Sequence, residues 1–151
     1  MCPMPLTEFA DRLNEVIPDI ARELARRQQN ELFKGKITLP QLFVLEYLLR
    51  NGEAKMTDLA RCIHVTTAAM TGIVDRLVRD GYLLRVAFPK DRRIVRIKVT
   101  SRGASLVSKL HQQRREMLIK TFSTISESDR SDYLRVLVQI RDNLVNNKDS
   151  T

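Results

Sequence analysis

Two short helical patterns joined by one tight turn, in residues 56–77, constrain the fold of this chain more than any other feature. Thr57 is a candidate N-cap for a first helix. That helix would carry its apolar side chains on one side, at Leu59, Ala60 and Ile63. The pattern breaks after Ile63, and Thr66 offers a second N-cap. Apolar residues then recur at helical spacing, at Met70, Ile73, Val74 and Leu77. Two short helices joined in this way predict a helix-turn-helix.

The second helix is expected to end at Asp80-Gly81, because glycine readily adopts the positive φ that closes many helices. Its first turns carry small or hydroxylic side chains, at Thr67, Ala68, Thr71 and Gly72. Such side chains allow a helix to enter a DNA major groove, which is about 12 Å wide. Groove contact is therefore our hypothesis for this face, and an ordinary solvent-exposed helix surface is the alternative.

Two strand-like segments, residues 82–88 and 94–99, follow at once. In the second, Val95, Ile97 and Val99 alternate with Arg96 and Lys98, which is the pattern of a half-buried strand. The expected hairpin tip between them is Pro89-Lys90-Asp91-Arg92-Arg93. Seven basic residues and one acidic residue occur from Arg85 to Arg102. We interpret this hairpin as a basic wing that contacts phosphates or a minor groove; an ordinary solvated turn is the alternative.

The overall charge agrees with a polyanionic partner. The chain has 151 residues, of which 43% are hydrophobic, and a formal net charge of +8. That charge favours double-stranded DNA first and an acidic membrane surface second. No apolar run of about 18 residues predicts a spanning helix, and the first residues do not resemble a signal peptide. With only two cysteines, we expect a cytoplasmic protein without a disulfide framework.

The residues before the helix-turn-helix predict two further helices. Residues 6–32 form an amphipathic pattern, in which Pro18 predicts a kink or a junction between two helices. Its apolar stripe is Phe9, Leu13, Val16, Ile17, Ile20 and Leu24. Thr38 and Gln41 then form a capping box, and Asn51-Gly52 ends the helix that it opens. That helix is apolar on almost every side, at Leu42, Phe43, Val44, Leu45, Leu48 and Leu49, so it is expected to be the central core helix.

Two helices are predicted after the hairpin. One runs from Thr100 to about Phe122, and the other is capped by Ser126 with Asp129. The last helix repeats apolar residues at Tyr133, Leu137, Ile140 and Leu144. The terminal helices are too few to build a core alone, so we expect residues 1–36 and 101–151 to form a helical dimerisation lobe around a DNA-binding lobe of residues 37–100. The predicted dimer contacts are Phe9 and Leu13 in the first helix, together with Tyr133, Leu137, Ile140 and Leu144 in the last helix. A two-fold dimer would place two recognition helices about 34–36 Å apart, one turn of DNA.

Several motifs together resemble the MarR family (multiple-antibiotic-resistance regulators), which are winged helix-turn-helix dimers. Before the helix-turn-helix, the chain resembles the family pattern at Leu39-x-Gln41-x-x-x-Leu45. In the recognition region, it resembles the family at Thr71-x-x-Val74-Asp75-Arg76-Leu77, followed by Gly81-Tyr82-Leu83-x-Arg85. Asp91-x-Arg93 with Val99-Thr100-x-x-Gly103 resembles the wing and the next helix, and is the most specific part. The resemblance covers residues 8–145. His64 departs from it where glycine is common, and Gly72 departs from it where a larger polar residue is common.

The resemblance implies a fold that is mainly α with a small two-stranded β-wing, and the function of a sequence-specific regulator. We expect a ligand-responsive repressor that binds a pseudo-palindromic operator as a homodimer. The DNA contacts would come from Thr66, Thr67, Ala68, Ala69, Thr71, Gly72, Arg76, Lys90, Asp91, Arg92 and Arg93. Arg93 would enter a minor groove with Asp91 holding its guanidinium. Arg76 would either contact phosphate or pair with Asp75 or Asp80.

The resemblance also implies an effector, often an aromatic or phenolic acid, in a crevice between the two lobes. The candidate ligand residues are Arg12, Arg26, Phe43, Tyr47 and Arg85. Cys62 is expected to be a buried small apolar side chain, and Cys2 or Cys62 would serve an alternative, oxidant-sensing regulator. A second alternative is a non-specific or architectural DNA-binding protein. His64 and His111 form no recognisable metal site, and no cofactor motif or catalytic motif occurs, so an enzyme is not expected.

Overall fold

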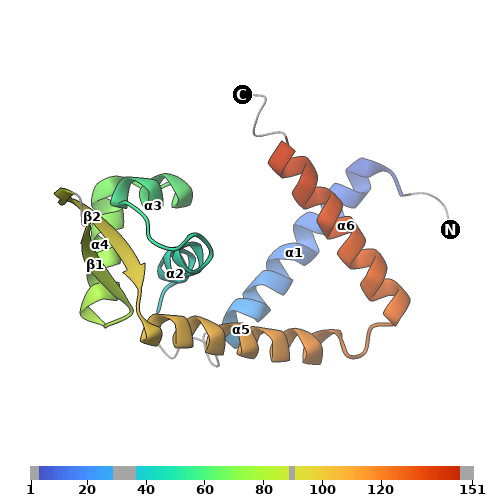
Figure 1. Cartoon of the computed structure of the whole chain (residues 1–151). Helices are drawn as coiled ribbons and strands as arrows, with labels where there is room; N and C mark the ends of the chain where they lie inside the picture. The colour runs from blue at the N-terminus through green and yellow to red at the C-terminus, as the bar shows by residue number, and fades with distance from the viewer. Residues whose placement is uncertain (1–3, 29–36, 89–90, 147–151) are drawn as a thin grey trace. The chain divides into compact units, whose positions relative to one another are not determined.

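The computed structural model describes residues 4–28, 37–88 and 91–146, except the side chains of residues 88 and 91–94. Within these ranges the chain is mainly helical with one small antiparallel sheet, as expected (Figure 1). The elements in order are α1 (Leu6–Gln28), α2 (Leu39–Asn51), α3 (Met56–Ile63), α4 (Thr67–Arg79), β1 (Leu83–Phe88), β2 (Asp91–Val99), α5 (Ser101–Phe122) and α6 (Glu127–Asn146). Two compact units are present, Met1–Gln113 and Arg114–Thr151, and their boundary lies within α5.

The hydrophobic core of the first unit is built around α2. Its buried side chains Val44, Leu45 and Leu48 pack with apolar residues of the other elements, among them Leu59, Met70, Val74, Leu77, Ile97, Val107 and Leu110. Full burial of one such side chain contributes about 1.5–3 kcal/mol. The expectation of a core helix is therefore confirmed for these residues. It is wrong for Phe43 and Leu49, which are 46% and 44% exposed because the core covers only part of the circumference of α2.

Both ends of α2 follow the local signals. The Thr38 backbone N–H donates to Gln41 Oε1 over 2.8 Å, so the buried Gln41 amide satisfies a free donor at the helix start. Gly52 has φ 80°, and its N–H donates to the Leu48 carbonyl over 2.8 Å. These contacts confirm the two predicted ends.

The start of α3 differs from the prediction, because its N-cap is Lys55 and not Thr57. The physical reason is that Ala54, the residue before Lys55, forms an isolated antiparallel bridge with Ile97. The Ala54 N–H donates to the Ile97 carbonyl over 3.1 Å, and the Ile97 N–H donates back over 2.8 Å. The chain leaves this bridge at Lys55, so the helix begins at Met56.

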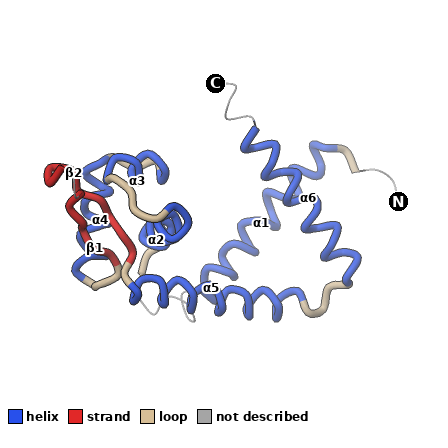
Figure 2. The backbone as a smooth tube through the Cα atoms, viewed as in Figure 1, coloured by secondary structure: helices blue, strands red, loops and turns tan. Residues whose placement is uncertain are grey.

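The sheet pairs β1 with β2, from Leu83 opposite Val99 to Ala87 opposite Val95 (Figure 2). Beyond an irregularity after Ala87, Phe88 pairs with Asp91. This last pairing extends β2 to Asp91, so the expectation that this strand begins at Ile94 is wrong. The first strand begins at Leu83 and not Tyr82, because the Tyr82 N–H donates to the Leu77 carbonyl and still belongs to the end of α4.

One hydroxyl joins the end of the sheet to α5. Thr100 precedes the helix, and its Oγ1 accepts from the Gly103 N–H over 3.1 Å while donating to the Gly81 carbonyl over 2.7 Å. A Cβ on Gly103 would lie 2.3 Å from the Tyr82 carbonyl oxygen. Since atoms do not approach so closely, only glycine allows α5 to pack this tightly against the turn after α4.

The helix α1 is one continuous helix with Pro18 inside it. The alternative of two separate helices is therefore wrong: a proline removes one backbone hydrogen bond, and the helix continues on both sides of it. The predicted extension to residue 32 lies outside the described residues. In the second unit, the Asp129 N–H donates to Ser126 Oγ over 3.1 Å, which confirms the predicted cap of α6. None of the described helices combines the length and the apolar character that a membrane span requires.

Candidate nucleic-acid interface

The exposed face of the candidate interface begins at the N-terminus of α4. Thr66 Oγ1 accepts from the Ala69 N–H over 3.1 Å, so Thr66 is the N-cap as predicted. The side chains of Thr66, Thr67, Ala68, Ala69 and Gly72 are exposed, and Thr71 is half-buried. Thr71 Oγ1 donates to the Thr67 carbonyl over 2.8 Å, which fixes that hydroxyl along the helix. A Cβ on Gly72 would meet no atom of the described residues within 4 Å, so the helix surface is open at this position.

The opposite face holds α4 in place. Met70, Val74 and Leu77 are almost completely buried in the core. The helix ends at Arg79 with Asp80 as its C-cap, and Gly81 follows with φ 78°, as the Asp80-Gly81 pair predicted. One face of α4 is buried and the opposite face is exposed, so packing of the buried face fixes the rotation of the helix about its axis. This rotation keeps the small side chains pointing outward.

Two ion pairs occupy the carboxylates beside this face. Asp75 Oδ1 lies 2.5 Å from Arg85 Nη2, which links α4 to β1. Asp80 Oδ1 lies 3.4 Å from Arg79 Nε. Both acidic residues that we considered for Arg76 therefore have other partners. Arg76 is exposed and forms no ion pair with another described residue, which favours the phosphate alternative.

The wing is only partly described. Asp91, Arg92 and Arg93 lie in β2 and not in a turn, but the description excludes their side chains. Lys90 lies outside the described residues, and the contact between Asp91 and Arg93 stays a prediction. Farther along β2, Arg96 Nη1 lies 3.0 Å from Glu53 Oε1, beside the bridge at Ala54. No local sequence pattern predicts this link, because it joins residues 43 positions apart.

The candidate ligand residues do not gather at one place. Arg12 pairs with Glu8 and Arg26 with Glu23, in exposed contacts within α1. The hydrogen bond to Glu23, with its negative charge, raises the pKa of Arg26. Arg85 is engaged by Asp75. Phe43 and Tyr47 do share a site, because both line an open pocket between α2 and α3.

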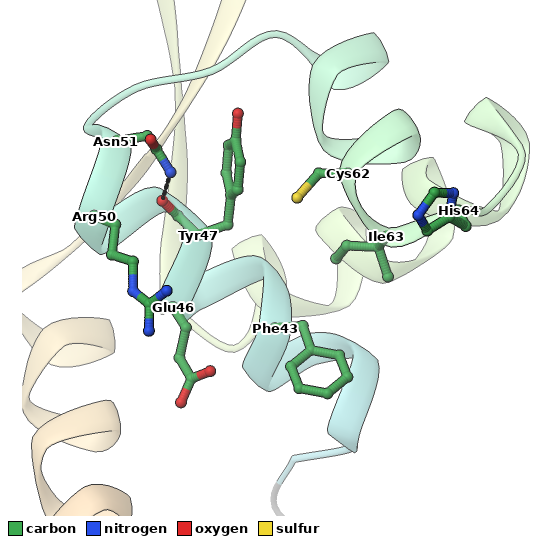
Figure 3. Close-up of a pocket in the computed structure, with 8 residues that line it drawn as sticks. All are labelled: Phe43, Glu46, Tyr47, Arg50, Asn51, Cys62, Ile63 and His64. Atoms are coloured by element: carbon green, nitrogen blue, oxygen red, sulfur yellow. Dashed lines mark hydrogen bonds between the residues drawn. The ribbon is translucent and has the colours of Figure 1, made fainter. Parts of the chain in front are cut away.

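That pocket has a volume of about 420 Å³ (Figure 3). It is lined by Phe43, Glu46, Tyr47, Arg50, Asn51, Cys62, Ile63 and His64. Cys62 is exposed, so the expectation that it is buried is wrong. The short helix α3 turns Leu59 and Ala60 into the core, which leaves Cys62 at its edge facing Tyr47. Cys2 lies outside the described residues.

The predicted dimer residues are exposed in the single chain. Phe9 and Leu13 are exposed on α1, and Tyr133, Leu137, Ile140 and Leu144 are exposed on α6. The apolar surface of α6 is wider than the predicted stripe, since it also includes Leu134, Val136, Val138 and Val145. These four residues were not predicted, because they fall between the positions of a single helical stripe.

His64 and His111 lie on different elements and have different surroundings. His64 is the turn residue that follows α3, and His111 Nε2 lies 2.6 Å from Glu46 Oε1 of α2. Among the described residues, no three His, Cys, Asp or Glu side chains lie close enough together to hold a metal ion.

Comparisons with known proteins show the fold and a family to which part of the chain is similar. Residues 37–95 match the model of the MarR family. The HTH-type transcriptional repressor MdtR of Bacillus subtilis is 27% identical over 124 residues, which are 80% of this chain and 80% of that protein. A MarR family protein from Bacillus stearothermophilus has the same fold, with a TM-score of 0.80 and 23% identity over 94% of this chain and 99% of that one.

A further solved structure is that of an S. aureus MepR mutant bound to an oligodeoxyribonucleotide. Its TM-score is 0.67 at 22% identity, over 87% of this chain and 96% of that chain. The matched residues 37–95 include all of α2, α3, α4 and β1, so the family model falls on the elements that form the candidate interface. In its motifs, in residues 37–95 and in its fold, the chain is similar to the MarR family of winged helix-turn-helix transcriptional regulators.

Proposed function

We propose that this regulator binds a pseudo-palindromic operator as a homodimer and represses transcription until an effector releases it. The observation that carries the proposal is the exposed, unobstructed face of α4. Its small side chains Thr67, Ala68 and Gly72 point away from a core that fixes the helix. A helix with such a face can approach base edges closely, because no long side chain holds it away from the groove floor.

The charge of the chain and two relatives support this proposal. A net charge of +8 favours a polyanion. Arg76 on α4 forms no ion pair with another described residue and would contact a phosphate beside the groove. The related MdtR is named a repressor, and the MepR mutant of similar fold was solved with an oligodeoxyribonucleotide. DNA contacts would come from the proposed residues of α4 and from Lys90 to Arg93 of the wing.

The homodimer would use the terminal helices. Residues 1–36 and 101–151 would form the dimerisation lobe and residues 37–100 the DNA-binding lobe. The large apolar side chains exposed on α1 and α6 favour this, because such surfaces are costly in water and are usually covered by a partner. A two-fold axis between two copies would present two α4 helices to successive major grooves.

The effector would be a small aromatic or phenolic acid. Phe43 and Tyr47 favour an aromatic ligand, because they line the pocket between α2 and α3. Arg12, Arg26 and Arg85, the other candidate ligand residues, do not line this pocket. Each has a carboxylate partner, so binding through them would first have to displace Glu8, Glu23 or Asp75.

Selection of bound sequences from random DNA tests the proposal, when it is repeated with candidate aromatic acids present. The expected result is an enriched inverted repeat whose half-sites lie about ten base pairs apart. Loss of enrichment with one of the acids would identify the effector. An architectural DNA-binding protein, which the high charge also favours, would enrich no motif. Its affinity would fall steeply with salt and differ little between sequences.

A further inference from the structure

The strip of α4 that faces away from the core carries very small side chains. A residue two positions along a helix is rotated by roughly 200°, so Ala68 and Gly72 lie opposite the buried Met70. Both are exposed, and a Cβ on Gly72 would meet no atom of the described residues within 4 Å. In the first two turns of α4, this outermost strip therefore projects only one methyl group, that of Ala68.

The long polar side chains that read base edges do not occur in this part of α4. In the major groove, Arg and Lys read guanine, and Asn and Gln read adenine, each through hydrogen bonds to the base edge. None of these four residue types occurs between Thr66 and Asp75. A carboxylate can accept a hydrogen bond from cytosine, but that of Asp75 is already paired with Arg85. Hydrogen bonding by long side chains therefore cannot select a base here.

The threonine hydroxyls add little discrimination between bases. Thr66 Oγ1 accepts from the Ala69 N–H over 3.1 Å, and Thr71 Oγ1 donates to the Thr67 carbonyl over 2.8 Å. Both hydroxyls thus form hydrogen bonds within the helix itself. A hydroxyl both donates and accepts, so that of Thr67 would tolerate several bases. Apolar contact is the remaining way in which the first two turns of α4 can select a base.

Thymine is the base that an apolar contact can select. Among the four bases, only thymine carries a methyl group in the major groove, and alanine packs against that group. We propose that α4 selects thymine through contact between the Ala68 methyl group and the thymine C5-methyl group. Gly72, one turn later, allows this contact because no side chain there holds the helix away from the bases. The inference rests on the proposed function and adds the chemical group by which the operator is recognised.

Deoxyuridine tests the contact without any change in the protein. Uracil pairs with adenine as thymine does and lacks only the C5-methyl group. Each thymine of the selected operator is replaced by deoxyuridine at the same position of both half-sites, and fluorescence anisotropy measures the affinity at constant salt. At one thymine position we expect the affinity to fall about fourfold per methyl group, hence roughly 15-fold for two half-sites. An operator that tolerates every replacement within about twofold overturns the proposal.

Methylated cytosine separates the methyl group from the rest of the base pair. At the sensitive position, the T·A pair of both half-sites is replaced by C·G or by 5-methylcytosine·G. These two operators differ only in the methyl group, which 5-methylcytosine presents at the same place as thymine. We expect the methylated operator to bind at least about fivefold more tightly. Equal binding of the two would overturn the proposal, because thymine would then be selected through its other groups.

Two glycine variants test the assignment to Ala68. Ala68→Gly removes the methyl group, so its affinities for the thymine and deoxyuridine operators should agree within about twofold. Ala69→Gly is the matched control, because it is also exposed and loosens the same turn, but lies roughly 100° away around the helix. It should keep the parental ratio between the two operators, even where both affinities fall. A parental ratio in Ala68→Gly, or an equal loss of the ratio in both variants, would overturn the assignment.

The selection experiment separates this inference from the function on which it rests. Failure of the parent protein to select any operator would contradict the proposed function, and the inference with it. An operator that is selected but is insensitive to deoxyuridine and to cytosine methylation would contradict the inference alone, and specific DNA binding would stand.

Discussion

Asp75 Oδ1 on α4 lies 2.5 Å from Arg85 Nη2 on β1, so an ion pair joins the recognition helix to the first strand of the wing. The two side chains are 52% and 41% exposed, so solvent screens the pair. We predict that Asp75→Asn and Arg85→Gln each change the free energy of unfolding by less than about 1 kcal/mol. A double-mutant cycle in urea should give a coupling energy of about 0.2–1 kcal/mol. Zero coupling would show that the pair does not stabilise the fold.

Two glycines should respond oppositely to the same substitution. Gly103→Ala places a Cβ 2.3 Å from the Tyr82 carbonyl oxygen, so α5 must move and the protein should lose about 1–3 kcal/mol or more. Gly72→Ala meets no atom within 4 Å and should stabilise α4 by about 0.5–1 kcal/mol, because alanine favours a helix. Thermal unfolding of both variants checks this. A destabilised Gly72→Ala protein would show that this face is not open.

Ala68→Glu should abolish operator binding and leave the fold intact. Ala68 is exposed in the first turns of α4, so glutamate adds bulk and negative charge only at the proposed DNA surface. Ser105→Glu is the control, because it adds the same side chain at an exposed position of α5. Fluorescence anisotropy with the selected operator measures both. Operator affinity equal to that of the parent in Ala68→Glu would show that this face points elsewhere.

Leu137→Asp should weaken or unfold the homodimer. Leu137 lies on the proposed apolar interface of α6, and an unpaired carboxylate is costly to bury there. Gln139→Asp adds the same charge at an exposed polar position of the same helix and should have little effect. Sedimentation at micromolar concentration separates dimer from monomer. A parent protein that sediments as a stable monomer would contradict the dimer itself.

The wing should respond unequally to the loss of its two charges. Arg93→Ala should weaken operator binding by about 1–3 kcal/mol and lower the salt slope by about one, because it removes a cation from the DNA contact. Asp91→Ala removes a negative charge, which by long-range electrostatics alone should strengthen binding. If Asp91 positions Arg93, binding should weaken instead, because a mobile arginine loses roughly 2 kcal/mol of side-chain entropy on binding. Tighter binding of Asp91→Ala across a whole salt series would rule out the positioning role.

The helices and their ends could be predicted wherever the signal is local. Thr66 caps α4, Gly52 closes α2 and Ser126 caps α6 as expected, because each contact joins residues within four positions of one another. The buried side of α4 also follows from its sequence, since the spacing of Met70, Val74 and Leu77 alone places them on one face. The motifs near Arg85 and Gly103 that resemble the MarR family also predicted that a wing, and then a further helix, would follow α4.

Contacts between distant residues decided the rest. The bridge between Ala54 and Ile97 moved the start of α3 away from Thr57, although threonine is the better cap by itself. Pairing of Phe88 with Asp91 turned part of the expected hairpin tip into strand. The exposure of Cys62 and the pocket that it lines depend on how α3 packs on α2. Sequence alone determined the elements, because helix caps and periodicity act over one or two turns. Only the tertiary structure decided their junctions and the pocket, because those depend on which distant surfaces meet in space.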